Sequence, residues 1–527
     1  MANVPLKSIK FPGLTDTYTV PQVDNSLTQT GAAADAKVVG DAINKITNFV
    51  TPQMFGAKGD GETDDTEALQ DAFDSGKFVL IPKGTYLVKT NTTDRLSVPS
   101  NRRITFDDGA ILKGINENEA TSSILLLNNV HDITIIGGEL YGDRESNTKT
   151  AAGAGNGLQI THCTNVTIEN LYIHHCFTDG CYVLDLTGGY FDNCNFANNG
   201  RMGHTITCAK NVTLHNCVAS NSNRISPMRG FGLEPNYDTD IIENVIYDTC
   251  TAIADANTVG SDCFYFNLNN IATNHDPINL VYRNCTAING GMFMGASEPS
   301  EKLIGSVLID HFVSINAKLA IFNVGKYAYD KSCRIVIDEP LAINGNTSGA
   351  SNSSGDFLYS SADDSTKTYG NITINHALMR DGGNLRKFMQ LWTNVENVVV
   401  NGGEFARIVA PDKVKYIGEF PDSVLNIDTT GTYTLDVRNV NLANNTETTH
   451  TAAFRTGIAK NTECMITKTG SGTDCFQLTG CTVRGRTTGD NPFFTTETPG
   501  AFIRLKFVDT NVAYIVEISS DSDWTLT

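Results

Sequence analysis

A repeat of 23 residues constrains the fold of this chain more than any other feature of its sequence. Gly157, Gly180 and Gly203 are 23 residues apart, and Gly230 follows after 27. The positions one and three residues after these glycines carry Leu158 and Ile160, Cys181 and Val183, His204 and Ile206, and Phe231 and Leu233. A coil of this length holds only short strands and turns, so it cannot bury its own apolar face and must stack on its neighbours.

A second ladder runs in step with the glycines. Asn170, Asn193 and Asn216 are also 23 residues apart, and the phase continues less evenly through Asn244 and Asn284. Each of the first three asparagines precedes a small or apolar residue: Leu171, Cys194 and Cys217. Parallel stacking places equivalent side chains above one another, which predicts interior columns and turn columns of asparagine. The spacing therefore predicts a parallel β-helix. It leaves the handedness open, although right-handed crossovers are the rule for parallel strands.

The segment before the repeats predicts a short helix that caps the stack. In FGAKGDGETDDTEALQDAF (residues 55–73), Asp64 is a candidate N-cap and Glu67 resembles the return arm of a capping box. Apolar residues spaced three and four apart give this helix one apolar face, and FVLIPKGTYLV predicts two short strands around a Pro-Lys-Gly turn. We expect the helix, at residues 64–75, to cover the open edge of the first coil.

Charge and cysteine content limit the classes of partner. The net charge of −19 argues against nucleic acid and anionic membranes, and mildly against a highly acidic polysaccharide, although a local groove can differ from the average. No apolar run approaches the roughly 18 residues of a membrane helix, and no secretory signal is expected. The 13 cysteines are odd in number and lack zinc-like spacing, and several recur in register. We therefore expect buried, reduced thiols and neither a metal nor a cofactor.

The opening FGAKGDGETDDTEALQDAF followed by VLIPKGTYLV resembles the pectate-lyase-like superfamily of right-handed β-helices, which includes phage tailspikes and polygalacturonase-type enzymes. With the repeats, this resemblance covers residues 52–420. The leader VDNSLTQTGAAADAKVVGDAI is similar to the N-terminal segments of phage tail proteins. The resemblance implies an all-β, right-handed parallel β-helix in a homotrimeric fibre that binds, and often cleaves, bacterial surface polysaccharide.

Three regions are expected along the chain. Residues 1–51 form a virion-attachment segment in which apolar residues from Ala36 to Val50 follow heptad spacing. This seam fits a trimeric coiled coil and a surface helix on its own chain equally well. Residues 52–420 form the β-helix with its capping helix. Residues 421–527 alternate on a period of two between Gly, Asn and Thr turns, which predicts an antiparallel β module.

Glu234 is the leading candidate for a catalytic acid. It follows Gly230 by four residues, which aligns it with Leu184 and Thr207 of the preceding coils and points it outward. Gly232 beside it leaves room for a ligand. Because glycoside hydrolysis uses two carboxylates, a partner is needed.

The candidate partners of Glu234 come from the following segments. Asp238 lies in the next turn, and Asp255 and Asp262 belong to the next long loop, where the register of SDCFYF fits two phases. A solvated acid at the end of a strand is the alternative interpretation of Glu234 itself.

Other polar and aromatic residues are candidates for substrate contact, namely Asp179, Arg201, Arg229, Tyr182 and Tyr237. FTDGCYV, which contains Asp179, looks like one acidic motif of polygalacturonases, but Arg201 and Met202 stand where that family has further acids. Ideal strand geometry places Asp179 about 16 Å from Glu234. His204 occupies an inward position and is expected to be buried and hydrogen-bonded.

The sequence thus favours a phage or prophage tailspike that depolymerises bacterial surface polysaccharide by hydrolysis, with Glu234 as general acid. A tail protein that binds its receptor without cleaving it and a polysaccharide lyase share the same scaffold and stay open. The expected partners are the polysaccharide and, through the N-terminus, the phage tail or baseplate. The expected location is the virion, after synthesis in the host cytoplasm.

Overall fold

A computed structural model describes most of residues 49–404 and a series of strands after them; before residue 49 it describes residues 8–9 and 18–19. Between 49 and 404, the residues outside this description are 77, 116–122, 148–154, 256–261, 272–276, 297–302, 319, 326–332, 346–356, 361–368, 381–388 and 391–394. The tail-like leader and all but the end of the heptad seam lie outside the described residues, so the predictions about them stay predictions.

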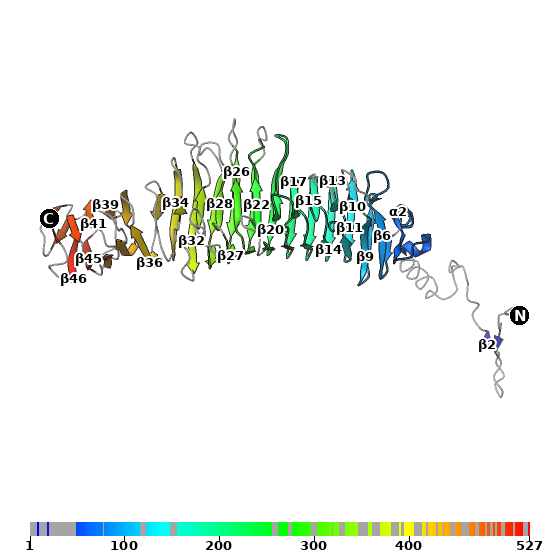
Figure 1. Cartoon of the computed structure of the whole chain (residues 1–527), viewed down its shortest axis with the longest axis horizontal. Helices are drawn as coiled ribbons and strands as arrows, with labels where there is room; N and C mark the ends of the chain where they lie inside the picture. The colour runs from blue at the N-terminus through cyan, green and yellow to red at the C-terminus, as the bar shows by residue number, and fades with distance from the viewer. Residues whose placement is uncertain are drawn as a thin grey trace.

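The main body is one column of stacked coils, and each coil contributes parallel strands to three faces (Figure 1). The predicted fold class, a right-handed parallel β-helix, is confirmed. The first face contains β7 (Leu96–Ser97), β10 (Ser123–Asn128), β19 (Arg229–Leu233), β22 (Phe264–Asn267), β25 (Met292–Gly295), β28 (Phe322–Val324), β31 (Leu358–Ser360) and β33 (Met389–Gln390). Three long strands run from the first face onto the second: β13 (Asn156–Glu169), β15 (Cys181–Asp192) and β17 (Met202–His215).

The second and third faces are built in the same way. The second contains β3 (Phe49–Val50), β5 (Phe78–Ile81), β8 (Arg102–Phe106), β11 (His131–Ile136), β20 (Ile242–Asp248), β23 (Ile278–Arg283), β26 (Gly305–Asp310), β29 (Arg334–Asp338), β34 (Val395–Glu404) and β35 (Val414–Ile417). The third contains β4 (Asp60–Asp64), β6 (Gly84–Lys89), β9 (Ala110–Ile115), β12 (Glu139–Tyr141), β14 (Tyr172–His174), β16 (Asn195–Ala197), β18 (Val218–Ser220), β21 (Thr251–Ile253), β24 (Thr286–Ile288), β27 (Val313–Ile315) and β30 (Leu341–Ile343). β32 (Tyr369–Arg380) pairs with both β29 and β30.

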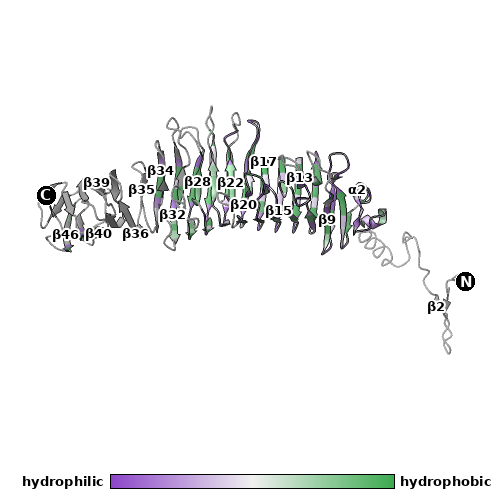
Figure 2. Cartoon of the chain, in the orientation of Figure 1, coloured by the Kyte–Doolittle hydropathy of each residue, from purple (hydrophilic) through white to green (hydrophobic). Residues whose placement is uncertain are grey.

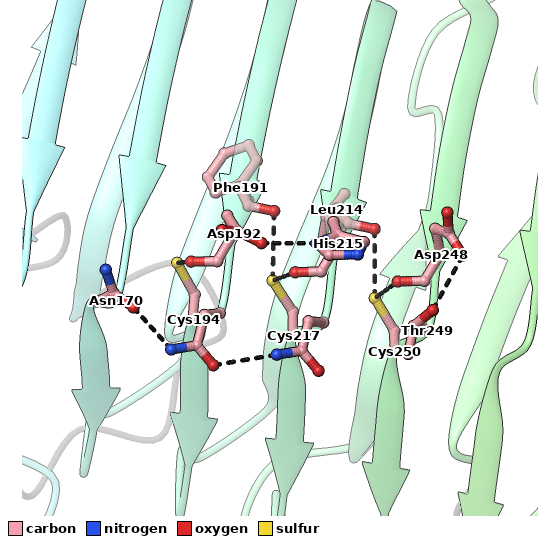
Figure 3. A network of polar contacts seen from close by, with 12 residues as sticks. Asn170, Phe191, Asp192, Cys194, Leu214, His215, Cys217, Asp248, Thr249 and Cys250 are labelled. Atoms are coloured by element: carbon pink, nitrogen blue, oxygen red, sulfur yellow. Dashed lines mark hydrogen bonds and ion pairs between the residues drawn. The ribbon is translucent and has the colours of Figure 1, made fainter.

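The register of the coils follows the sequence repeat. Leu158 pairs with Cys181, Cys181 with His204, and His204 with Phe231. The asparagine ladder is present as predicted: Asn193 donates its side-chain amide to Asn170 at 2.6 Å, and Asn216 donates to Asn193 at 3.2 Å (Figure 3).

These asparagines have left-handed backbone conformations, which Asn tolerates better than most residues. The adjoining cysteines are buried free thiols that bond to backbone carbonyls (Figure 3). Cys217 Sγ, for example, donates to the carbonyl oxygens of His215 at 3.4 Å and Phe191 at 3.6 Å. The turn therefore connects successive coils through both side-chain amides and thiols.

Helix α2 (Thr66–Asp74) covers the first coil with its buried apolar face, as predicted (Figure 1). Its start differs from the prediction, because Asp64 ends strand β4 and Asp65 occupies the N-cap position. The Asp65 carboxylate accepts hydrogen bonds from the backbone N–H groups of Lys58 at 2.6 Å and Gly59 at 2.9 Å rather than capping the helix. Asp64 nevertheless accepts the backbone N–H of Thr66 at 3.1 Å, so the predicted capping bond of Asp64 is present, whereas the return bond from Glu67 is absent among the described residues.

The interior of the column is apolar, and hydrophobic segments recur along the strands from β9 to β34 (Figure 2). His204 is part of this interior and is fully buried, as predicted, but neither ring nitrogen has a hydrogen-bond partner within the described residues. Its ring instead meets Phe191 and Phe196 edge to face, with centroids 4.9 and 5.3 Å away. Burial lowers the pKa of His204 to about 3, so the ring is neutral and unsuited to act as a base near neutral pH.

The C-terminal strands form two further sheets. One contains β36 (Phe420–Ile427), β38 (Val437–Leu442), β40 (Glu463–Lys468), β45 (Phe502–Asp509), β46 (Val512–Ile518), β42 (Thr482–Arg484) and β43 (Gly489–Asp490). The other contains β37 (Gly431–Leu435), β39 (Thr448–Phe454), β41 (Asp474–Thr479), β44 (Phe493–Thr496) and β47 (Thr525–Leu526). Most of the later pairs, such as β45 with β46, are antiparallel as predicted, but β42 pairs with β46 in parallel, and β36 to β41 also pair in parallel. The prediction missed this because alternation on a period of two does not report strand direction.

None of the helices within the described part of the chain is long and apolar enough to cross a membrane.

Substituting Asn193 tests the turn ladder. Asn193→Ala should lower the free energy of unfolding by about 1–2 kcal/mol. Alanine is strained in the left-handed backbone conformation, and the substitution also removes both hydrogen bonds of the side-chain amide. Asn193→Gly keeps the backbone freedom and should lose less. Denaturant unfolding of both variants checks this; an equal loss in both would show that the left-handed backbone is not the cause.

Candidate active site

A polar cavity of about 420 Å³ lies on the first face, across the coils from β7 to β19. Its lining residues are Arg95, Asn156, Gln159, Thr178, Asp179, Tyr182, Arg201, Thr207, Glu234 and Asn236. The structure thus brings together four of the predicted site residues: Asp179, Tyr182, Arg201 and Glu234. Gln159 and Tyr182 are adjacent in register on β13 and β15, so stacking of the coils builds the floor.

Asp179 and Arg201 form the most strongly bonded pair in the cavity. Arg201 donates from Nε to Asp179 Oδ1 at 2.8 Å and from Nη2 to Oδ2 at 2.5 Å. The Asp179 carboxylate also accepts the backbone N–H of Met202 at 3.2 Å and the hydroxyl of Thr205 at 2.9 Å. Asp179 is only 1% exposed, so its first role is to hold Arg201 in position. The prediction of a direct substrate contact does not fit this satisfied carboxylate well.

Glu234 follows directly after β19 and reaches the same guanidinium. Its Oε2 lies 3.7 Å from Arg201 Nη1, and its side chain is 20% exposed, so it points into the cavity rather than freely into solvent. Burial raises the pKa of Glu234, Arg201 and Arg229 lower it, and the negative charge of Asp179 raises it. The net result is a carboxyl group that stays protonated to higher pH than an ordinary glutamate, which suits a proton donor.

The turn after Glu234 is held by a buried aspartate. Asp240 accepts the backbone N–H groups of Asn236 at 2.7 Å and Tyr237 at 2.9 Å. This arrangement fixes Asn236 at the rim of the cavity, while Tyr237 is 64% exposed and outside the lining. The predicted substrate contact of Tyr237 is therefore not supported by its position.

The expected separation of about 16 Å between Asp179 and Glu234 is wrong. Both carboxylates contact one guanidinium group, which places them less than about 9 Å apart, a distance compatible with the 6.5–9.5 Å range of inverting glycosidases. The backbone register was as expected, since the slot of Asp179 aligns with Met202 and Arg229. The estimate failed because Arg201 extends along the face and the acidic side chains converge on it.

Two local features also differ from the sequence expectation. Gly232 does not leave room for a ligand, because a Cβ there would lie 2.4 Å from Met202 Sδ, which already fills the space. Glu234 aligns with Thr207 but not with Leu184, because Leu184 pairs with Cys208. This bulge places the buried Thr207 at the cavity, where its hydroxyl donates to the carbonyl of Val183 at 3.1 Å.

The predicted carboxylate partners of Glu234 lie elsewhere. Asp262 pairs with Arg229, Oδ2 to Nη2 at 3.0 Å, on the coil beyond Glu234 and outside the lining. Arg229 stacks over Tyr265 with its guanidinium carbon 5.2 Å from the ring centroid, so it too belongs to that neighbouring group. Asp238 is exposed in the turn, and Asp255 accepts a hydrogen bond from Asn223.

Several lining residues were missed by the sequence analysis. Gln159 and Asn156 lie 23 residues before Tyr182 and Asp179, so the repeat could have found them. Asn156 accepts the hydroxyl of Thr178 at 2.7 Å. Arg95 precedes the regular repeat and gave no such signal.

The described residues contain no group of three His, Cys, Asp or Glu side chains arranged to hold a metal ion.

Comparisons with known proteins agree with this fold. The family model described as "Right handed beta helix region" matches residues 156–332. Protein YclG of Bacillus subtilis, which has no assigned function, is 28% identical over 221 residues, which cover 36% of this chain and 38% of YclG. A capsule KN3-specific depolymerase of Klebsiella phage KN3-1 is 33% identical over 186 residues, covering 31% of this chain and 23% of that protein.

Phage appendage proteins are also among the relatives. The pre-neck appendage protein of Bacillus phage phi29 is 24% identical over 240 residues, covering 40% of this chain and 27% of that protein. Among solved structures, the A-module of the mannuronan C-5 epimerase AlgE4 of Azotobacter vinelandii superposes with a TM-score of 0.49 and 15% identity, covering 70% of this chain and 95% of that one.

The chain spans between about a quarter and two fifths of the length of these curated relatives. The resemblance to right-handed β-helix proteins is confirmed, and phage tail-type proteins are among the relatives.

Removing the charge of Arg201 should raise the pKa of Glu234 further. Arg201→Gln takes away the cation that stabilises the ionised carboxylate, while burial and the charge of Asp179 remain. Titration of the Glu234 side-chain carboxyl by ¹³C NMR, assigned with Glu234→Gln, measures the change. Arg201→Lys keeps the charge and should move the pKa less; an unchanged or lower pKa in Arg201→Gln would contradict this electrostatic account.

Proposed function

We propose that this chain is a phage tail protein that binds bacterial surface polysaccharide and cleaves it in the cavity of the first face. The observation that carries the proposal is the convergence of Glu234 and the Asp179–Arg201 pair on one polar cavity. The capsule depolymerase of Klebsiella phage KN3-1 among the relatives supports the choice of polysaccharide as substrate.

Hydrolysis is the reaction that we assign first. Glu234, with its raised pKa, donates its proton to the glycosidic oxygen as the bond to the anomeric carbon breaks. A water molecule bonds to that carbon from the opposite side and gives its proton to the second carboxylate of the cavity, Asp179. The two acids lie less than about 9 Å apart, a bound that admits this inverting geometry and the shorter retaining one alike. One of the hydrogen bonds of Asp179 must open to admit the water.

Elimination is the second candidate reaction. Asp179 already accepts four hydrogen bonds, which hinders its use as the base of a hydrolysis. In a lyase, one base removes the proton next to the carboxylate of a uronate, and the glycosidic oxygen leaves as a double bond forms in the sugar. Ionised Glu234 would take the proton, neutral Tyr182 would give its phenolic proton to the leaving glycosidic oxygen, and a cation of the cavity would neutralise the uronate. Burial raises the pKa of Tyr182 by more than its hydrogen bond with Thr207 lowers it, so the phenol stays protonated and suits a proton donor.

The position in the virion follows the relatives rather than the site. We infer that residues 1–51 attach the chain to the tail or baseplate, that residues 52–420 bind the glycan, and that residues 421–527 form a separate module. The pre-neck appendage protein of phage phi29 supports a virion location.

Two apolar columns support assembly of several copies, and we infer the homotrimer that the sequence resemblance implies. The column on the second face consists of Ile246, Val281, Leu308 and Val336, and that on the third face consists of Ile253, Ile288, Ile315 and Ile343. All eight side chains point outward and are partly exposed. Contact between the second face of one copy and the third face of the next closes into a ring and leaves the cavity face free.

Substituting Glu234 tests the catalytic assignment. Glu234→Gln should lower kcat for depolymerisation by about 10³-fold or more, because the proton donor is lost, while polysaccharide binding is retained. Reducing-end release from bacterial capsule measures hydrolysis, and ultraviolet absorbance of an unsaturated product would show elimination instead. Asp238→Asn, in the adjoining exposed turn, is the matched control and should stay active. Full activity of Glu234→Gln would remove this residue from the mechanism.

A charge in an apolar column tests the assembly. Leu308→Glu should shift the chain from trimer to monomer in light scattering coupled to size-exclusion chromatography, because three copies would each bury an unpaired carboxylate. Thr134→Glu, in the polar early coils of the same face, should leave the assembly intact. A Leu308→Glu protein with unchanged mass would place the interface elsewhere.

A further inference from the structure

Arg95 is a cation of the cavity without a carboxylate partner among the described residues. It stands immediately before β7 and lines the same cavity as Glu234. Its Nη1 donates to Ser123 Oγ at a long 3.4 Å, and its Nε is buried without a hydrogen-bond partner within the described part of the chain. The guanidinium is thus partly removed from water, and the described residues supply neither the carboxylate nor the full set of hydrogen-bond acceptors that usually stabilise a buried cation.

The other two arginines of this region are paired. Arg201 is held by Asp179 and Glu234, and Arg229 is held by Asp262. Burial lowers the pKa of Arg95, and no acid among the described residues opposes the effect. Arginine nevertheless stays charged in proteins, so Arg95 presents a permanent, poorly solvated positive charge to the cavity.

We propose that the cavity binds a sugar residue that carries a carboxylate, and that Arg95 is the residue that recognises this group. This inference rests on the proposed function, because it takes the cavity as the glycan site. The planar fork of a guanidinium matches a carboxylate with two parallel hydrogen bonds. The amides of Asn156 and Gln159 in the same lining supply neutral groups for sugar hydroxyls.

The acidic net charge of the chain does not oppose this assignment. Charges separated by more than about 8 Å are largely screened at physiological ionic strength, so the local guanidinium decides what the cavity binds. The residues of the cavity therefore decide whether an acidic polysaccharide binds, and the net charge of the chain does not.

Binding of monosaccharides to the full chain tests the proposal without requiring cleavage. Saturation-transfer NMR with D-glucuronate, D-galacturonate, the neutral D-glucose and D-galactose, and D-glucose 6-phosphate compares the ligands directly. At least one uronate should bind the native chain at least fivefold more tightly than its neutral counterpart. Arg95→Gln should abolish that preference, whereas Arg103→Gln, an exposed arginine on the second face, should preserve it.

Three results would overturn the proposal: equal binding of uronate and neutral sugar, a preference retained in Arg95→Gln, or no uronate binding by the native chain at millimolar concentrations. Tighter binding of the sugar phosphate than of both uronates would also reject a carboxylate as the ligand. The proposed cleavage fails separately, because a chain that prefers uronate but releases no product from polysaccharide retains the Arg95 site and loses only the catalytic assignment.

Discussion

Parallel backbone hydrogen bonding between coils, in strict register, is the constraint on which the rest of the structure depends. It places residue 181 on residue 158 and residue 204 on residue 181, so that each position of the repeat becomes a column. Inward columns make the apolar core, and turn columns make the asparagine ladder. Outward columns place side chains that are 23 or more residues apart beside one another, which is how residues from several coils build one cavity.

The stacking of the coils also places hydrogen-bonding partners around charged groups of the cavity, whose burial would otherwise raise the free energy of the fold. The carboxylate of Asp179 is almost fully buried, yet four donors compensate it, including both arms of the Arg201 fork. The same guanidinium then reaches Glu234, whose proton affinity reflects both its burial and the cation beside it. Within the described residues Arg95 has no carboxylate partner, and this difference separates a residue that organises the site from one that is available to a ligand.

The sequence predicted the architecture well because residues such as Gly180, Asn193 and Cys217 recur at the same spacing as the coils themselves. It predicted the location of Glu234 for the same reason. It did not predict that Asp179 and Glu234 share Arg201, because backbone spacing does not report how far a long side chain extends along a face. The sequence also did not predict the bulge at Thr207 or the Met202 side chain that occupies the space beside Gly232. Both depend on how neighbouring coils pack. Arg95 lies before the regular repeat, where register gave no guidance.

These observations describe a scaffold whose regular core carries an irregular, charged cavity on a face that the proposed assembly leaves free. The most direct test of the account is a structure of the Glu234→Gln chain with an oligosaccharide from a capsule that it binds. The account predicts a glycosidic oxygen within hydrogen-bonding distance of residue 234, with the sugars crossing the cavity of the first face. A glycan bound on the second or third face, or on the C-terminal sheets, with the cavity empty would contradict it.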